Sequence, residues 1–312
     1  MIIVSPAPAH TTLGNSVTAD RYARIFRALG WSVAVRGAYE HEPGECLVGL
    51  HAAKSASSVI AFREHYPDRK IVLVLTGTDL YRDIRNSALA RRAMEIADTL
   101  VTLQPAGLSE LPTALRSKAV AIIQSATPVA RQKTSARAAF TICVLGHLRH
   151  EKDPMRAAYA VRALPQSLNV RIVQAGRMLE ERYKDATALE TSKNSRYHFR
   201  GSVSRAAARR LLARSDLLVQ SSRMEGGANT VCEAIATGIP VIASRIPGNV
   251  GILGRDYPGL YPAGNTKALA ALLRQAATSA AYYAKLERAC RDLRPLVSVV
   301  RERNLWEGIL RS

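Results

Sequence analysis

Short apolar runs alternate with helical patterns along nearly the whole chain. In the first part the runs predict strands at Ile2–Ser5, Ser32–Arg36, Cys46–Leu50, Ile71–Thr76, Thr99–Leu103 and Val120–Gln124. The segments between them predict helices at Ser16–Leu29, Ser55–His65, Ala88–Ala97 and Ala106–Leu115. The strand runs are continuous rather than alternating, which is typical of strands buried on both faces. We therefore expect a parallel sheet covered by helices.

The alternation breaks at Ala126–Ala139, which is polar and basic and contains Pro128. We interpret this segment as a linker between two domains. A second set of predicted strands follows at Thr141–Leu145, Val170–Ala175, Tyr197–Arg200, Leu217–Gln220, Val241–Ala243 and Gly259–Tyr261. Its predicted helices lie at Pro154–Leu164, Leu179–Glu190, Arg205–Ala213, Ala228–Thr237 and Lys267–Thr278. Asp153 and Ser204 are expected to cap two of them.

This pattern predicts an α/β fold of two doubly wound, Rossmann-like domains that face a central cleft. We place the first domain at residues 1–135 and the second at residues 136–294, and we expect a C-terminal helix at 295–312 to complete the first. Ligands of such sheets bind outside the carboxyl ends of the strands, so loops at those ends are the places to search for a site. His198, within a predicted strand, is expected to be partly buried rather than catalytic.

The composition limits the partners of the chain. Its 44 Lys and Arg residues against 25 Asp and Glu residues give a formal charge of +19, which permits nucleic acid, an anionic membrane surface or small anionic substrates. The arginines are scattered without interleaved aromatic residues, and no apolar run reaches membrane-spanning length. We therefore expect a solvated basic surface that steers anions, no nucleic-acid partner and no stable membrane insertion.

Cysteine usage and the first residues point to a compartment. The four cysteines, at positions 46, 143, 232 and 290, are far apart and have no metal-ligand spacing. The first residues predict a strand rather than a signal peptide. Together these features predict a reduced, cytoplasmic protein with Cys143 and Cys232 buried, and with no structural metal.

The stretch Arg223–Ala234 lies between two apolar runs and carries the strongest chemical signal. It holds Glu225, the pair Gly226–Gly227, and then a predicted helix that bears Glu233. A glycine-rich turn that opens a helix is an anion site, because free backbone N–H groups and the positive helix end point at it. Two glutamates around that anion can accept hydrogen bonds from hydroxyl groups. The pattern therefore predicts a site for a nucleotide sugar.

Two further loops of the second domain favour the same site. Arg149 and Lys152 follow a predicted strand, where two cations would neutralise the charge of a leaving diphosphate. Gly201 and Val203 end another strand on the same predicted edge, where backbone can line a planar base. The alternative for Arg149 and Lys152 is a solvated basic loop, and the alternative for Gly201 and Val203 is an ordinary turn. The glycine pair in the same domain favours the phosphate interpretation.

Three loops of the first domain lie at the carboxyl ends of predicted strands. They contain Gly14 with Asn15, His51 with Lys54, and Thr76, Thr78, Asp79 and Arg82. His51 and Asp79 are hypothetical acid–base groups, and the alternative is that Asp79 and Asp83 only cap the turn that follows. The sequence contains no Asp-x-Asp, Walker or GxSxG motif, so we expect neither a metal-bound diphosphate nor a cofactor.

These residues together resemble the GT-B glycosyltransferases of family 4, a retaining type. The resemblance spans Thr141–Ala277 and rests on Gly146–Lys152, the Glu-x7-Glu pair Glu225 and Glu233, and Ala236–Ser244. It implies that Arg149 and Lys152 hold the diphosphate, Glu233 the ribose and Glu225 the donor sugar. The backbone of Gly226, Gly227, Ala228, Asn229 and Thr230 would complete the phosphate site.

The first domain is similar to that of the selenosugar synthases of selenoneine biosynthesis. The similarity rests on Ile3–Pro6, Gly14–Ala19, Leu50–Ala56 and above all Leu73–Ile84. It implies a 1-selenosugar product, made from a UDP-sugar such as UDP-N-acetylglucosamine and from selenophosphate, with release of UDP and phosphate. Gly14, Asn15, Lys54, Thr76, Thr78 and Arg82 would then bind the acceptor. An ordinary hexosyltransferase acting on a glycan or lipid, and a non-catalytic module that binds nucleic acid, are the alternatives.

Overall fold

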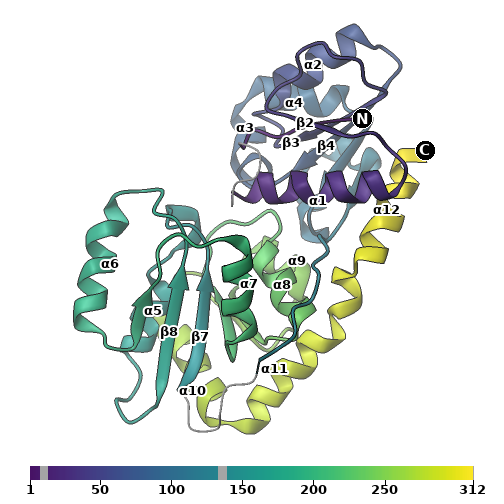
Figure 1. Cartoon of the computed structure of the whole chain (residues 1–312). Coiled ribbons are helices and arrows are strands. Elements are labelled where there is room, and N and C mark those ends of the chain that lie inside the picture. Colours follow the sequence, from purple (N-terminus) through teal and green to yellow (C-terminus); the bar gives the residue numbers. More distant parts are fainter. Residues whose placement is uncertain (8–12, 133–138, 312) are drawn as a thin grey trace. The chain divides into compact units, whose positions relative to one another are not determined.

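The computed structural model describes residues 1–7, 13–132 and 139–311. Contacts divide the chain into two compact units (Figure 1). Unit 1 comprises Met1–Gln124, Glu225–Gly227 and Val299–Ser312, and unit 2 comprises Ser125–Met224 and Ala228–Ser298. The predicted linker falls partly on residues 133–138, which lie outside the described residues.

Unit 1 contains a parallel sheet in the order β2-β1-β3-β4-β5-β6. Its strands are β1 (Ile2–Val4), β2 (Ala34–Arg36), β3 (Cys46–Leu50), β4 (Lys70–Leu75), β5 (Thr99–Thr102) and β6 (Ala119–Ala121). Its helices are α1 (Gly14–Ala28), α2 (Ala56–His65), α3 (Ile84–Asn86), α4 (Ala88–Ile96) and α12 (Val299–Arg311). The strand order reverses at β1, between β2 and β3.

Helices cover both faces of this sheet, as the continuous apolar runs predict. One face packs Leu47, Ile71 and Leu73 against α2 and α4, and the other packs Val48, Val72 and Val74 against α1. The second face is completed by Trp306 of α12, whose ring meets Tyr22 and Phe26 of α1 edge-on at centroid distances of 4.7 and 4.9 Å. Burial of these large aromatic rings fixes α12 on unit 1.

Unit 2 contains a second parallel sheet, in the order β12-β11-β10-β7-β8-β9. Its strands are β7 (Phe140–Leu145), β8 (Val170–Ala175), β9 (Tyr197–Phe199), β10 (Leu217–Gln220), β11 (Val241–Ser244) and β12 (Leu260–Tyr261). Its helices are α5 (Arg156–Arg162), α6 (Arg182–Lys193), α7 (Arg205–Ala213), α8 (Asn229–Thr237), α9 (Pro247–Leu253), α10 (Thr266–Thr278) and α11 (Ala280–Asp292). The order reverses between β7 and β10, as in the doubly wound dinucleotide-binding sheets.

Some predicted elements are wrong. The helix predicted at Ala106–Leu115 is replaced by two 3₁₀ segments, Pro105–Glu110 and Thr113–Lys118, because Pro112 keeps Leu111 extended (ψ 147°). The strand predicted at Val120–Gln124 ends at Ala121. His198 is exposed rather than partly buried.

One predicted helix start is wrong and one is confirmed. Asp153 has a left-handed backbone (φ 43°), which is incompatible with an N-cap, so α5 begins only at Arg156. Its carboxylate instead pairs with the Arg156 guanidinium at 2.9 Å. Ser204 caps α7 as predicted, because its hydroxyl accepts the N–H of Ala207.

Within the described part of the chain, every helix is too short or too polar to cross a membrane.

Candidate functional site

Two loops meet at the point where the sheet of unit 2 reverses its strand order. One loop follows β7 and the other follows β10, and the two strands are hydrogen-bonded neighbours. The loops are tied together, since the Ser221 hydroxyl donates to the Lys152 and Asp153 carbonyl oxygens at 3.2 and 3.0 Å and the Arg223 N–H donates to the Glu151 carbonyl at 2.8 Å. This is the edge at which doubly wound sheets bind ligands.

Three cations lie on these two loops. Arg149 and Lys152 are the two that the sequence predicts, and the Arg149 side chain is 41 % exposed, 3.7 Å from Glu151. The third is Arg223, whose side chain is 45 % exposed and lies 3.6 Å from Asp153. Sequence reasoning gave Arg223 no role, although it opens the stretch that holds Glu225. The left-handed turn at Asp153 is what carries its carboxylate to Arg223.

The loops after β8 and β9 continue the same edge. The Gly176 N–H donates to the Gly201 carbonyl at 2.8 Å. A Cβ on Gly176 would lie 1.9 Å from the Gly146 carbonyl oxygen, so only glycine allows this close approach between neighbouring loops. Val203, half-buried, follows Gly201 just before α7. The four loops thus form one continuous edge in unit 2.

Helix α8 follows the glycine pair and presents its N-terminus at this edge. The residue before it is Ala228, which has no polar side chain to cap the helix. Thr230 donates from its hydroxyl to Gln220 at 2.9 Å, which holds the first turn to the end of β10. Glu233, on the second turn, is 3.6 Å from Arg205 at the start of α7.

Of the donor-site residues predicted from the sequence, unit 2 holds Arg149, Lys152, Gly201, Val203, Ala228, Asn229, Thr230 and Glu233. Glu225, Gly226 and Gly227 are grouped with unit 1. Glu225 is buried, with 8 % of its surface exposed.

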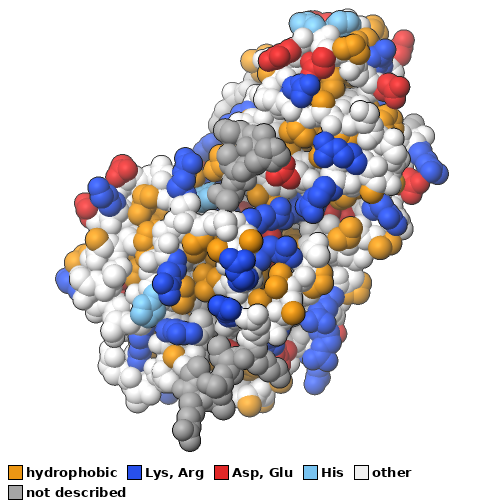
Figure 2. Space-filling model, viewed as in Figure 1, with side chains coloured by type: hydrophobic (Ala, Val, Ile, Leu, Met, Phe, Trp, Pro, Cys, Tyr) orange, Lys and Arg blue, Asp and Glu red, His pale blue; other side chains and the backbone are white. Residues whose placement is uncertain are grey.

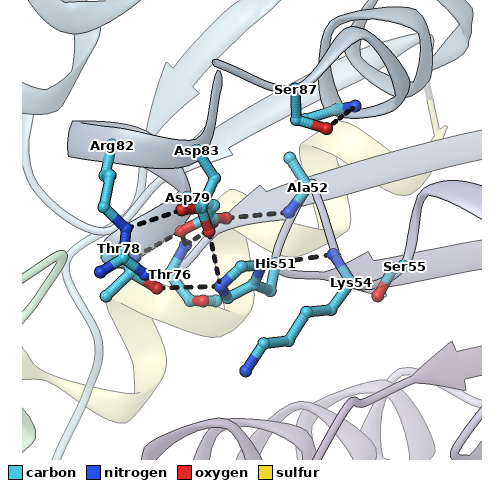
Figure 3. A network of polar contacts seen from close by, with 12 residues as sticks. His51, Ala52, Lys54, Ser55, Thr76, Thr78, Asp79, Arg82, Asp83 and Ser87 are labelled. Carbon is cyan, nitrogen blue, oxygen red and sulfur yellow. Dashed lines mark hydrogen bonds and ion pairs between the residues drawn. The ribbon is translucent and has the colours of Figure 1, made fainter. Parts of the chain in front are cut away.

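The loops of unit 1 form a second polar site (Figure 3). Asp79 lies at its centre and is fully buried. Its carboxylate accepts the backbone N–H of Ala52 at 2.9 Å, of Thr76 at 3.0 Å and of Gly77 at 2.7 Å. These bonds tie the loop after β3 to the loop after β4. With both oxygens occupied by backbone donors, Asp79 is better placed to organise the loops than to exchange protons.

The tie at Asp79 brings His51 against Thr78. The His51 Nε2 atom lies 3.0 Å from the Thr78 hydroxyl and 3.6 Å from the Asp83 carboxylate, which in turn accepts from Arg82 Nε at 2.9 Å (Figure 3). His51 is buried and has a left-handed backbone (φ 74°), an uncommon conformation for a residue with a side chain. Lys54, from the same loop, extends its ammonium group away from the network, without a partner among the described residues.

Gly14 and Asn15 are the first two residues of α1, which follows β1. They lie at the same edge as the two loops of the polar site, because β1, β3 and β4 are parallel neighbours. Gly14 and Asn15 therefore lie at the same edge of the sheet as His51 and Thr78, although residues 8–12 of this loop lie outside the described residues.

Cysteine chemistry and a metal cluster are not features of the described residues. All four cysteines are buried and none forms a disulfide bond within the described residues, and burial raises the pKa of Cys46 and of Cys143 to about 12. Such thiols are not nucleophilic thiolates at neutral pH. In residues 1–7, 13–132 and 139–311, no three His, Cys, Asp or Glu side chains are arranged to hold a metal ion.

Basic side chains are spread over the surface. On the face shown in Figure 2, Lys and Arg gather over the region of α7. This helix contains Arg205, Arg209 and Arg210, and Arg214 follows its last residue. The surface is thus suited to attract anions over distances longer than a contact.

Comparisons with known structures identify the architecture. Sucrose-phosphate synthase from Thermosynechococcus elongatus is similar with a TM-score of 0.80 at 14 % identity, over 99 % of this chain and 98 % of that one. HepE of Anabaena in complex with UDP-glucose gives a TM-score of 0.75 at 14 % identity, over 99 % of each chain. The UDP-forming α,α-trehalose-phosphate synthase from Burkholderia xenovorans gives 0.69 at 12 % identity, over 86 % and 73 %. At these identities the likeness concerns the fold, and it confirms the predicted GT-B architecture.

No curated protein matches the chain by sequence. The model of the family "Glycosyl transferases group 1" matches residues 128–292, which include every strand and loop of the edge described in unit 2. The chain therefore belongs to the glycosyl transferases group 1 family and is a glycosyltransferase.

Proposed function

We propose that this enzyme transfers a sugar from a UDP-sugar to selenophosphate and so forms a 1-selenosugar. The donor half of the proposal is supported by the edge of unit 2, where three cations and the uncapped N-terminus of α8 lie on neighbouring loops and suit a diphosphate. Glu233 is available for the ribose. A fold neighbour, HepE of Anabaena, is known in complex with UDP-glucose.

The acceptor half is carried by one observation, the pairing of His51 with Thr78 across two loops. The loop of His51 also bears Lys54, whose ammonium group has no partner among the described residues. A cation and a hydroxyl on two loops that are tied together suit a small, multiply charged oxyanion better than an extended neutral glycan. The similarity of Leu73–Ile84 to the selenosugar synthases falls on the second of these two loops.

The proposed reaction has two steps. The selenium atom of selenophosphate attacks C1 of the sugar while the bond from C1 to the UDP oxygen breaks, and Arg149 and Lys152 neutralise the charge that grows on UDP. Water then attacks phosphorus and the Se–P bond breaks, which gives the selenosugar and inorganic phosphate. Selenium is already nucleophilic, so the first step needs little help from a general base.

The test is UDP release by the purified protein with and without selenophosphate, with UDP-N-acetylglucosamine and then UDP-glucose as donor. We expect UDP release that depends on selenophosphate and a sugar product with the isotope pattern of selenium in its mass spectrum. Robust UDP release without selenium in any sugar would contradict the proposal and favour an ordinary hexosyltransferase.

Variants at the donor edge connect this activity to the site. Arg149→Ala is expected to lower kcat by about a hundredfold, because a cation aimed at the leaving group acts mainly in the transition state. Arg92→Ala is the matched control, since this exposed arginine on α4 makes only a 4.0 Å pair with Glu95. Equal kinetics in both variants would show that the diphosphate binds elsewhere.

A further inference from the structure

Both ring nitrogens of His51 are already engaged within unit 1. The Nε2 atom faces Thr78 and Asp83, and Nδ1 lies 3.4 Å from the Lys54 N–H. That N–H also donates to the His51 carbonyl oxygen at 3.1 Å. A bound acceptor would therefore have to displace protein groups in order to reach the imidazole, which is buried to 3 % exposure.

This arrangement assigns the tautomer of the neutral ring. A proton on Nδ1 would point at the Lys54 N–H, whereas a proton on Nε2 has acceptors in front of it. Nε2 therefore carries the proton and donates to the closer group, the Thr78 oxygen at 3.0 Å. The Asp83 carboxylate at 3.6 Å favours the same proton position.

The Thr78 hydroxyl then has its own proton left over. Its oxygen accepts from His51, and the described residues offer its O–H no acceptor within hydrogen-bonding distance. Thr78 is half-buried, whereas His51 is buried. A hydroxyl that accepts one bond is polarised and donates the next one more strongly, and an anion is its best acceptor.

We propose that Thr78 is the residue of this network that contacts the acceptor anion, and that His51 and Asp83 are positioning residues that aim its O–H. The proposal rests on the proposed function, because it takes the acceptor to be a phosphorus oxyanion. Lys54, on the same loop as His51, carries a positive charge that has no partner among the described residues. The negative charge of Asp83, which would otherwise repel the anion, is paired with Arg82 at 2.9 Å.

Kinetics separate the roles. Thr78→Val keeps the shape but removes the donor, and it is expected to raise the KM for selenophosphate about tenfold or more, since a bond to a charged group is lost. The KM for the UDP-sugar should stay within about twofold, and Thr78→Ser should restore the wild-type value. His51→Asn, a residue that tolerates a left-handed backbone, and Asp83→Asn should raise the acceptor KM less than Thr78→Val does.

Two results would overturn the assignment. One is an unchanged acceptor KM in Thr78→Val with a large loss in His51→Asn, which would place His51 itself on the acceptor. The other is an equal rise in the KM of both substrates in Thr78→Val, which would mean a structural role. Nitrogen-15 NMR of histidine-labelled protein must also show His51 as the Nε2–H tautomer. An Nδ1–H tautomer would contradict the proposed hydrogen bond from His51 to the Thr78 oxygen.

A binding probe keeps this proposal distinct from the proposed function. Monothiophosphate is titrated into the wild-type protein and the Thr78 variants, and its affinity is measured by calorimetry. One outcome is that selenophosphate is not turned over, while thiophosphate binds wild type and Thr78→Ser about tenfold more tightly than Thr78→Val. The proposed selenosugar activity is then wrong, and the role of Thr78 as the contact to the anion is supported. If thiophosphate binds all three proteins equally, or does not bind the wild type, the proposed role of Thr78 is wrong.

Discussion

Arg205 shows how a single cation can act on a substrate site through another side chain. It is the first residue of α7, where a positive charge is unfavourable because the helix end is itself positive. Its guanidinium lies 3.6 Å from Glu233, and the Glu233 side chain is only 13 % exposed. We infer that Arg205 positions the Glu233 carboxylate, which we propose binds the ribose.

We therefore expect Arg205→Ala to raise the KM for the UDP-sugar about three- to tenfold with kcat nearly unchanged, because one charge-assisted positioning contact is lost. The melting temperature should stay level or rise slightly, since a cation leaves a helix N-terminus. Steady-state kinetics and a thermal melt measure both. Arg210→Ala on the same helix is the control, and a fall in stability with unchanged KM would reduce the pair to a structural contact.

Sequence reasoning located these residues but not their partners. Loops at the carboxyl ends of parallel strands could be placed at one edge, so His51, Thr78 and Asp79 were found together. Their pairing could not be predicted, because it depends on the left-handed backbone of His51 and on three backbone donors that converge on Asp79. Arg223 was overlooked for the same reason, since its link to Asp153 requires a left-handed turn there.

At the scale of elements, the loops after β3 and β4 depend on Asp79. Replacing its carboxylate by an amide in Asp79→Asn leaves one oxygen for three buried N–H groups and turns an N–H₂ group toward them. Unit 1 should lose about 1–3 kcal/mol of unfolding free energy. Both tryptophans of the chain, Trp31 and Trp306, lie in unit 1, so urea unfolding followed by their fluorescence reports on this unit.

The exposed Asp68, in the turn before β4, provides the matched control Asp68→Asn. This variant should unfold at the same urea concentration as the wild type. An Asp79→Asn protein that is equally stable would show that the loops are held by other contacts. A stable Asp79→Asn protein with lost activity would instead revive the acid–base hypothesis for Asp79.

Elements with continuous apolar runs were predictable, because burial on both faces leaves a strong signal. The strands of both sheets were found for this reason, with shifts of a few residues at their ends. Polar segments that contain proline were not. Pro112 divides the predicted helix at Ala106–Leu115 into two 3₁₀ segments, and the Gln104 side chain, which accepts the Gly107 N–H, stabilises the first of them. Side-chain caps of this kind leave no periodicity in the sequence.

On the scale of the whole molecule, the two units repeat one design. Each has a six-stranded parallel sheet that reverses its strand order, at β1 in unit 1 and between β7 and β10 in unit 2. In unit 2 the polar loops that carry the candidate chemistry leave the two strands beside the reversal, β7 and β10. In unit 1 they leave β3, which is next to β1, and β4, which lies one strand further away. The family match runs from residue 128 to residue 292, so it includes the candidate donor edge of unit 2 and leaves out the polar loops after β3 and β4 of unit 1.

The formal charge of +19 belongs to the molecule rather than to any one site. The proposed reaction brings two anionic substrates together, and a positive surface raises the rate at which each arrives. We expect kcat/KM for the UDP-sugar to fall about tenfold as salt rises from about 0.1 M to about 1 M, where the screening length shrinks from about 10 Å to about 3 Å. The value of kcat should change much less, because the bound state is less exposed to salt.

Sucrose at matched osmolarity is the control for this experiment, since it changes water activity without screening charge. A flat salt profile would mean that the arginines serve solubility alone.

Binding to a random DNA duplex is the second experiment on the basic surface. If it bound tightly, with the same salt dependence, while UDP had no affinity, the charge would serve nucleic acid. Weak duplex binding beside a salt-sensitive kcat/KM would instead assign the basic surface to the capture of small anions.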